Sequence, residues 1–290
     1  MKQPLRKDLE PVAASFIVKE LVESHFDPNW HFHPHYQLFL VEEGTGTRFI
    51  GDSIKPFGPG DLVFLGPNLP HLWRSDQVYF SKQSDLITKG IVVYFADDFL
   101  GSDFLKKQEM NLLRQLLNNA RQGLEWTGPT RSYAEMALRN LAAQGVGFER
   151  ILSLLTLLNR LSQATDHRFL TSSGYTNTVK PSETDRMQLV HDYVLDHFPD
   201  EISLDTVSDL AGMTPPAFCR YFKARANKTF SEFVSEVRIG HACKLLMAGK
   251  LNITQISFES GFRTLSNFNR QFKFITGQTP SSYVRTYRDL

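Results

Sequence analysis

Apolar positions follow two different periods along the chain, and the change falls near residue 95. Before it, apolar stretches are short and broken by Gly- and Pro-rich turns, as in YQLFLVEEGTGTRFIG from residue 36, DLVFL at 61–65 and GIVVYF at 90–95. Short strands with turns at such close spacing are typical of a sandwich or barrel. The sequence therefore predicts β-structure for residues 1–95.

From residue 96 to about 165 the apolar residues recur at helical spacing, which predicts helices within 103–123, over about 130–144 and within 148–164. The third helix carries a wide apolar face, made of Ile151, Leu152, Leu154, Leu155, Leu157, Leu158 and Leu161. Leu152 and Leu157 widen it beyond what one core requires. Two interpretations stay open: the helix packs onto the β-structure, or it forms a dimer interface.

Residues 171–184, TSSGYTNTVKPSET, contain seven Ser or Thr among fourteen and lack an apolar face. This composition predicts an interdomain linker, which we place at residues 166–183. Residues 184–290 are predicted to be helical throughout. The expected fold class is α+β, a β-rich domain with following helices and then an all-α domain.

The last segment contains an internal repeat. Leu204, Val207, Ser208 and Gly212 match Ile253, Ile256, Ser257 and Gly261 at an offset of 49, whereas Phe218, Arg220, Phe222 and Lys223 match Phe268, Arg270, Phe272 and Lys273 at an offset of 50. One residue is therefore inserted in the second copy, at about Arg263. A repeat of this kind is one supersecondary unit used twice.

Each copy has the parts of a helix-turn-helix unit. Ser203 and Asn252 are candidate caps of a short first helix, and Thr214 and Thr264 of a second. Gly212 and Gly261 fall where the chain must turn with a positive φ. The phenylalanines at 218 and 222, and at 268 and 272, are spaced i, i+4 and are predicted to be core.

Basic residues gather on the second helix of each copy. Residues 214–230 hold four basic residues and no acid, and residues 260–288 hold five and no acid. The whole chain carries a net charge of only +1, so affinity for nucleic acid must come from such local patches. A solvated basic face would explain one patch; two related patches favour DNA.

Residues 184–290 closely resemble the AraC/XylS-type DNA-binding domain, with RIGHACKLL, GF, FNRQFK and GQTPSSYVR at that family's spacing. The resemblance implies two helix-turn-helix units joined by a long helix at about 231–249. It also implies that the two recognition helices enter successive major grooves of double-stranded DNA, about 34 Å apart. An activator that contacts RNA polymerase is expected from the same resemblance.

Carried over by position, the candidate DNA-binding residues are Pro216, Cys219, Arg220, Lys223, Arg263, Leu265, Ser266, Asn267, Arg270 and Lys273. An arginine can pair bidentately with guanine, and Asn267 with adenine. The first unit departs from a polar reading surface, because Pro215, Pro216 and Cys219 offer little hydrogen bonding. We therefore expect sequence specificity to depend mainly on the second unit.

Residues 25–95 resemble a cupin-type sensory domain, through HFHPH, the Gly-rich hairpin, PGD and PH. On the pattern of metal-binding cupins, His31, His33, Gln37 and His71 correspond to the ligands, and three imidazoles suit Zn, Fe or Ni. Gln37 replaces a charged Glu, however. We favour a pocket without metal or other cofactor, in which these four residues and Trp73 bind a small-molecule effector.

The composition, 41% hydrophobic and 22% charged, is ordinary for a globular protein. The first 23 residues interrupt every apolar run with charge, and the two cysteines form no disulfide framework, so neither a signal peptide nor a membrane span is expected and the cytoplasm is the predicted location. The favoured function is a ligand-responsive transcription regulator, which is not expected to be an enzyme. The protein is expected to form a homodimer. The alternatives are a metal-dependent cupin dioxygenase or isomerase with a DNA-binding domain, and an architectural DNA-binding protein.

Overall fold

A computed structural model of the protein describes residues 15–81, 83–175 and 184–288. The described residues form two compact units, the first mostly within residues 15–175 and the second mostly within residues 184–288. The first contains two β-sheets and three α-helices, and the second is made of helices, so the predicted α+β class is confirmed. None of the described helices is both long enough and apolar enough to cross a membrane.

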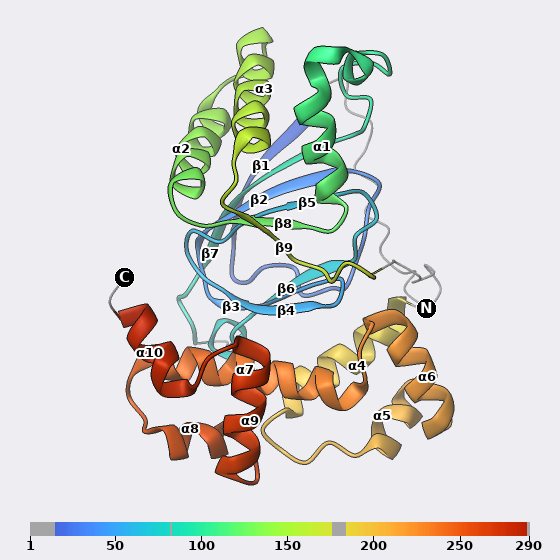
Figure 1. The fold of residues 1–290 in the computed structure, drawn as a ribbon, viewed down its shortest axis with the longest axis vertical. Helices are drawn as coiled ribbons and strands as arrows, with labels where there is room; N and C mark the ends of the chain where they lie inside the picture. The colour runs from blue at the N-terminus through green and yellow to red at the C-terminus, as the bar shows by residue number, and fades with distance from the viewer. Residues whose placement is uncertain (1–14, 82, 176–183, 289–290) are drawn as a thin grey trace. The chain divides into compact units, whose positions relative to one another are not determined.

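The first unit is built around two sheets (Figure 1). The larger has the order β1-β7-β2-β5-β8-β9 and the smaller β4-β3-β6. The strands are β1 Phe16–Glu23, β2 Tyr36–Glu43, β3 Gly46–Ile50, β4 Ser53–Phe57, β5 Leu62–Leu65, β6 His71–Ser75, β7 Thr88–Phe95, β8 Leu124–Trp126 and β9 His167–Phe169. Antiparallel pairs are formed by β1 with β7, by β2 with both β7 and β5, and by β3 with β6.

Strand β2 is buried on both faces, and its side chains alternate between two cores. Leu38 and Leu40 belong to the cluster shared with the helices, whereas Phe39 and Val41 belong to a cluster that includes Trp73 of the small sheet. Because successive side chains of a strand point to opposite faces, β2 divides the two cores. Its residue Gln37 has the same parity as Phe39 and faces the space between the sheets.

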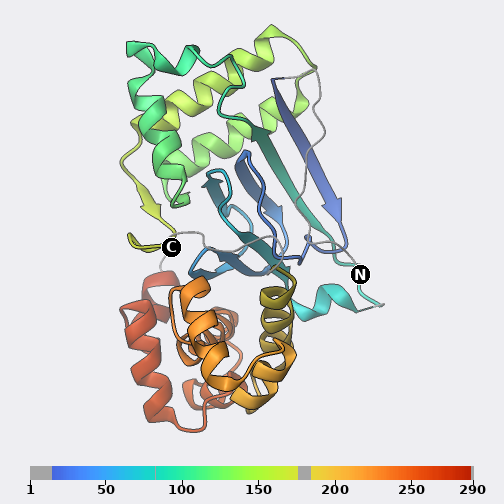
Figure 2. The same cartoon turned by 90° about the vertical axis from the view of Figure 1, so that its right-hand side faces the viewer.

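Three helices cover the outer face of the large sheet: α1 Asn111–Ala120, α2 Pro129–Ala143 and α3 Phe148–Gln163 (Figure 2). Leu154, Leu157, Leu158 and Leu161 of α3 are all buried in the cluster that this face shares with the helices. The interpretation that the apolar face of α3 packs onto the β-structure is therefore confirmed for these residues. Leu152, by contrast, remains 40% exposed.

The expectation of helix alone over residues 96–165 was wrong in two places. The first helix begins only at Asn111, after the 3-10 turns η2 Phe104–Lys106 and η3 Gln108–Met110; another such turn, η1, spans Gln77–Phe80. Residues 124–126 form β8, which pairs with β5. Buried Arg48 of β3 contacts Glu125 of β8 at 2.5 Å and Asp61 at 3.1 Å, so β8 is held by an ion pair as well as by its ladder. A three-residue strand is too short to show a period of two.

The predicted linker begins too early, because it includes another strand that is too short to show a period of two. His167–Phe169 forms β9 on the edge of the large sheet, and the following Leu170 and Thr171 are buried. The backbone of this segment donates from Leu170 N to Gly123 O at 2.9 Å and from Thr171 N to Gln122 O at 3.0 Å. Residues 166–171 therefore belong to the first unit, and residues 176–183 of the predicted linker lie outside the described residues.

The second unit consists of helices α4 Thr184–His197, α5 Leu204–Leu210, α6 Pro215–Ala226, α7 Phe230–Ala248, α8 Ile253–Glu259, α9 Leu265–Thr276 and α10 Pro280–Arg288. Helices α5 and α6, together with residues 198–203 that lead into α5, form one helix-turn-helix unit, and α8 and α9 form the other. The long helix α7 joins them, and its capping box of Thr229 and Glu232 fixes where it begins. The long helix expected at 231–249 is thus confirmed.

The two turns have the predicted repeat and the predicted insertion. Gly212 has φ 64° and Gly261 φ 82°. The residue after each glycine donates to the preceding helix, from Met213 N to Ser208 O at 2.9 Å and from Phe262 N to Ser257 O at 3.1 Å. The second helices then start at Pro215 and at Leu265, so Arg263 is the extra residue.

Four phenylalanines seat α6 and α9 on the rest of the domain. Phe218, Phe222, Phe268 and Phe272 are all 0% exposed, as the i, i+4 spacing predicts. The rings of Phe218 and Phe222 each pack against Phe230, with ring centroids 5.4 Å apart. Phe268 packs against Phe262 at the same centroid distance. Of the candidate caps, Thr264 and Asn252 accept from backbone N–H groups, whereas Ser203 and Thr214 do not use their side chains.

Replacing Phe268 by alanine is expected to destabilise the helical domain by about 3–5 kcal/mol, because it removes a fully buried ring. Phe274 on the same helix is 78% exposed and serves as the matched control. Urea unfolding followed by circular dichroism measures both variants. Equal losses for the two would contradict the assignment of Phe268 to the core.

Candidate functional site

The outward side of α6 carries the candidates of the first unit. Pro216, Cys219, Arg220 and Lys223 are all exposed, on the side opposite Phe218 and Phe222. Because the two phenylalanines are buried, the rotation of α6 about its own axis is fixed. The helix therefore offers one guanidinium and one ammonium to solvent, together with two side chains that hydrogen-bond poorly.

The outward side of α9 is richer in polar groups. Ser266, Asn267, Arg270 and Lys273 are exposed, whereas Leu265 is half-buried and packs against the core of this unit. The Arg270 guanidinium donates to Asn267 Oδ1 at 2.8 Å. The two side chains predicted to read bases are thus held side by side before any ligand is bound.

Two further exposed residues of α9 escaped the sequence analysis. Asn269 adds another amide, and Phe274 is four residues after Arg270 with 78% of its surface exposed. Of the phenylalanines in α9, Phe268 and Phe272 were predicted to be core from their i, i+4 spacing. Phe274 is out of phase with these two, which explains its exposure.

Arg263 contacts the first helix-turn-helix unit. It forms an ion pair with Glu201, and both side chains are about three-quarters exposed, at 76% and 74%. Lys228, one of the four basic residues counted for the first unit, lies 2.5 Å from Glu236. The cationic side chains on α6 and α9 are Arg220, Lys223, Arg225, Arg270 and Lys273, and of these Arg225 lies over the Tyr221 ring, 4.8 Å from its centre.

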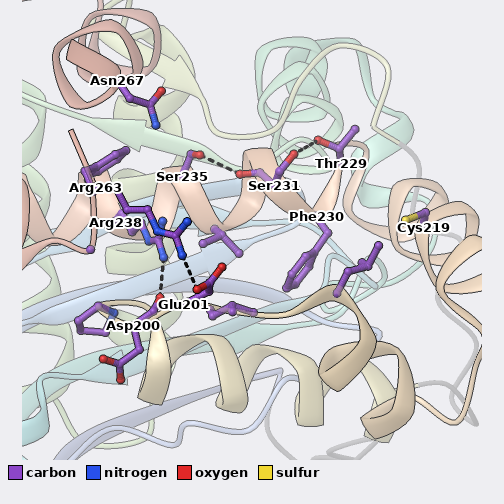
Figure 3. Close-up of a pocket in the computed structure, with 16 residues that line it drawn as sticks. Asp200, Glu201, Cys219, Thr229, Phe230, Ser231, Ser235, Arg238, Arg263 and Asn267 are labelled. Carbon is purple, nitrogen blue, oxygen red and sulfur yellow. Dashed lines mark hydrogen bonds and ion pairs between the residues drawn. The ribbon is translucent and has the colours of Figure 1, made fainter. Parts of the chain in front are cut away.

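A cleft of about 560 Å³ lies within the helical domain, between its two helix-turn-helix units and along the N-terminal half of α7 (Figure 3). Cys219 of α6 and Asn267 of α9 stand on its two sides. The remaining polar lining comes from Asp200, Glu201, Thr229, Ser231, Ser235, Arg238 and Arg263. The cleft thus separates two exposed faces that carry cations, as expected of a surface that follows a nucleic-acid backbone.

In the β-rich unit of the chain, three of the residues predicted to form the effector pocket converge. His31, His33 and His71 are buried, and their candidate ligand nitrogens all lie within 4.8 Å of one another. His31 and His71 are also joined as a bridge between two backbone segments. Gln37 reaches the same place from β2, with Oε1 2.9 Å from His33 Nε2. Trp73 lies beside them, 5.7 Å from the His71 ring.

Backbone carbonyls orient the three rings. The Nδ1 atoms lie 2.7 Å from Asn29 O in His31, 2.7 Å from Leu69 O in His71 and 3.1 Å from His35 O in His33. Because a carbonyl only accepts, this arrangement favours a proton on Nδ1 and a lone pair on Nε2 in His31 and His71, whereas His33 also has the acceptor Gln37 Oε1 beside its Nε2. Burial, with the neighbouring His31 and His35, lowers the pKa of His33 to about 4, so its ring is neutral at pH 7.

The residues present fit a divalent first-row metal. Three imidazoles with Nδ1 on backbone carbonyls are the usual protein arrangement around zinc and its neighbours, and Gln37 offers an amide oxygen as a weak fourth ligand. His35, in the same sequence run, is not part of the cluster. Tyr94, which the sequence analysis did not single out, packs beside the cluster: its ring lies edge-on to His33, with centroids 5.3 Å apart.

Comparison with known proteins separates the same two parts of the chain. Residues 207–286 match the family model described as a helix-turn-helix domain, and residues 19–77 match the one described as a cupin domain. The uncharacterized HTH-type transcriptional regulator YdeC of Bacillus subtilis is 30% identical over 100 residues, which are 34% of this chain and 34% of that protein. An uncharacterized HTH-type transcriptional regulator of Pseudoalteromonas carrageenovora is 33% identical over 95 residues, 33% of this chain and 56% of the relative.

The chain therefore spans about a third to just over half of the length of these curated relatives. Among solved structures, ToxT from Vibrio cholerae with a bound unsaturated fatty acid covers 93% of this chain and 94% of its own, at 18% identity and a TM-score of 0.36. That TM-score is too low to bear on the fold or on the function.

Replacing Gln37 by glutamate is expected to strengthen binding of added Zn²⁺ by about tenfold, or ~1.4 kcal/mol, because a carboxylate replaces a neutral amide beside the three imidazoles. Calorimetric titration of both proteins measures the difference. Adding His71→Ala to the Gln37→Glu variant should remove the gain. Equal Zn²⁺ affinity of the native and Gln37→Glu proteins would contradict this use of the cluster.

Proposed function

This chain joins a cupin domain to an AraC-type helix-turn-helix domain, and we propose that it is a sequence-specific, DNA-binding transcription regulator that responds to a small molecule. One observation carries the proposal. Each of two repeated units seats its second helix on buried phenylalanines and turns a basic, polar face outward. A protein that read no DNA would have no need of the same face twice.

The two faces are assigned different shares of the recognition. Arg270 and Asn267, with Ser266 beside them, give the second unit the donors and acceptors that distinguish base pairs in the major groove. The first unit offers Arg220 for base contact. Lys223 and Lys273 are assigned to phosphates, which fix the register of the protein on the duplex but carry no sequence information.

The effector site is assigned to His31, His33, Gln37, His71 and Trp73, all less than 7% exposed. In the metal-free form of the proposal, these side chains hydrogen-bond and stack with the effector directly. Were a divalent ion held by the three imidazoles, it would supply a Lewis acid for an oxygen atom of the effector. Stoichiometric zinc or iron in the purified protein would overturn the metal-free form.

Control of DNA binding requires only a difference in affinity. An effector shifts an equilibrium between two arrangements of the protein when it binds one of them more tightly, and DNA must in turn favour one of them. The converging histidines are also the one observation that favours the alternative, a cupin enzyme. Such an enzyme would turn over a substrate, whereas the regulator changes its DNA affinity.

Two finer points belong to the same proposal. A cytoplasmic location is supported by the two free cysteines, of which Cys219 is exposed and Cys243 buried. A contact with RNA polymerase, as in an activator, rests on the resemblance of the DNA-binding domain alone.

We assign a homodimer contact to the outer side of α3. Phe148 is 69% and Leu152 40% exposed, and their i, i+4 spacing puts them on one face that the core of this unit does not use. Single exposed apolar residues need no explanation, but neighbouring ones on one helix face are typical of a contact surface.

Selection of binding sites from random duplexes, with and without a library of metabolites, tests the function. A motif of two boxes about one helical turn apart is expected, with the enrichment changed by at least one metabolite. Arg270→Ala should then relax base preference in the second box and weaken binding by about 1–3 kcal/mol, more than Arg220→Ala does in the first. Greater relaxation by Arg220→Ala would contradict the unequal assignment.

Replacing Leu152 by aspartate is expected to convert the dimer to a monomer, because it buries a charge in the proposed contact. Sedimentation velocity measures the change, and Val78→Asp, at a residue 52% exposed on η1, is the control for an exposed apolar position elsewhere. A native chain that sediments as a monomer, or a Leu152→Asp variant that stays a dimer, would refute the assignment to α3.

A further inference from the structure

The two helix-turn-helix units meet directly at a seam, defined here as residues 198–201 of the first unit, Arg238 of α7 and residues 261–263 of the second unit. Figure 3 shows Arg238 and Arg263 side by side at the floor of the cleft, pointing toward Asp200 and Glu201. None of these seam residues belongs to the outward faces of α6 and α9, because Arg263 lies in the turn before α9.

Arg238 contacts both units with one side chain. Its Nε donates to Phe198 O at 2.8 Å and its Nη2 to Asp200 O at 2.7 Å, both in the segment that leads into α5. Its guanidinium carbon also lies 5.9 Å from the centre of the Phe262 ring, in the turn of the second unit. Burial, and secondarily the charge of Arg263, lowers the pKa of Arg238, so this cation is placed at a cost that its hydrogen bonds offset.

The second contact across the seam is backbone against backbone. A Cβ added to Gly261 would lie 2.4 Å from Phe198 O and 2.9 Å from Pro199 O. The matching Gly212 of the first unit has the same left-handed conformation, with φ 64°, yet a Cβ there would meet nothing within 4 Å. Gly261 is therefore needed for close approach as well as for its φ, and Gly212 for φ alone.

The inserted residue of the second unit closes the seam from outside. Arg263 has no counterpart in the first turn, and it pairs with Glu201 of the first unit. An ion pair this exposed contributes little by itself. Together with Arg238 and Gly261, however, it leaves few orientations in which the second turn satisfies all three contacts.

We propose that Arg238 is a positioning residue, which through this seam sets the distance between the two DNA-reading helices and thus the number of base pairs between the two boxes. The proposal rests on the proposed function. The helices must enter major grooves about 34 Å apart, and one base pair rises about 3.4 Å along the axis. A seam that slips by that length would accept a box displaced by one base pair.

The test uses the full chain and three duplexes that carry the selected boxes with the native spacer, one base pair more and one base pair fewer. The native protein is expected to prefer the native spacer by about tenfold or more, as for one mismatched base pair. In Arg238→Met the preference should fall close to unity, because the donors to Phe198 O and Asp200 O are lost. Arg238→Lys should lose the preference for the native spacer likewise, since an ammonium cannot span two carbonyls as a guanidinium does.

A direct phosphate contact by Arg238 predicts something different. Arg238→Met would then weaken all three duplexes alike and lower the slope of log affinity against log salt by about one, and Arg238→Lys would restore both. That result would overturn the proposal, as would variants that keep the native preference for spacing. If the native protein itself favours no two-box duplex, the proposed function fails and this inference fails with it.

The two glycines supply a matched pair that separates positioning from loss of fold. Gly261→Ala and Gly212→Ala should both lower the thermal unfolding midpoint, because both place a Cβ at positive φ. Only Gly261→Ala should reduce the preference for the native spacer. Equal effects of the two variants on spacing would count against the seam.

Discussion

Burial of Phe218, Phe222, Phe268 and Phe272 is the constraint on which the DNA-binding half of the molecule depends. Helices α6 and α9 have twelve residues each, a length that is marginal for an isolated helix in water. Their stability comes from packing, and the i, i+4 phenylalanines decide which side packs. Once those rings are inside, Arg220 and Arg270 are turned out, so the choice of reading residues follows from the choice of core residues.

A comparable division governs the cupin domain. Alternation along β2 sends Leu38 and Leu40 to the helices and Gln37 and Phe39 to the space between the sheets. The histidines reach that space from two backbone segments joined at His31 and His71, and a backbone carbonyl oxygen lies beside the Nδ1 of each ring. In both domains, therefore, the packing of apolar side chains and the backbone fix where the polar side chains point. These polar side chains are buried in the cupin domain and exposed in the DNA-binding domain.

The sequence predicted those features that a regular spacing of residues or an internal repeat makes visible. The helix-turn-helix units, the positive φ of Gly212 and Gly261 and the insertion at Arg263 all followed from comparing the two copies. What depended on contacts distant in sequence was missed: β8, held through Glu125 and Arg48, and β9, held against Gly123. Gly261 looked equivalent to Gly212, because only the folded chain brings Phe198 and Arg238 beside it. Side-chain convergence at the three histidines was suggested by the resemblance to metal-binding cupins, but ring orientation was not.

Two reading helices of unequal chemistry, held at one spacing, are the centre of this account. Hydroxyl-radical footprinting of the full chain on a selected duplex examines this directly. Two protected stretches are expected on one face of the duplex, centred about one helical turn apart, or about 10–10.5 base pairs. A single protected stretch, or uniform weak protection that disappears as salt is raised, would contradict it.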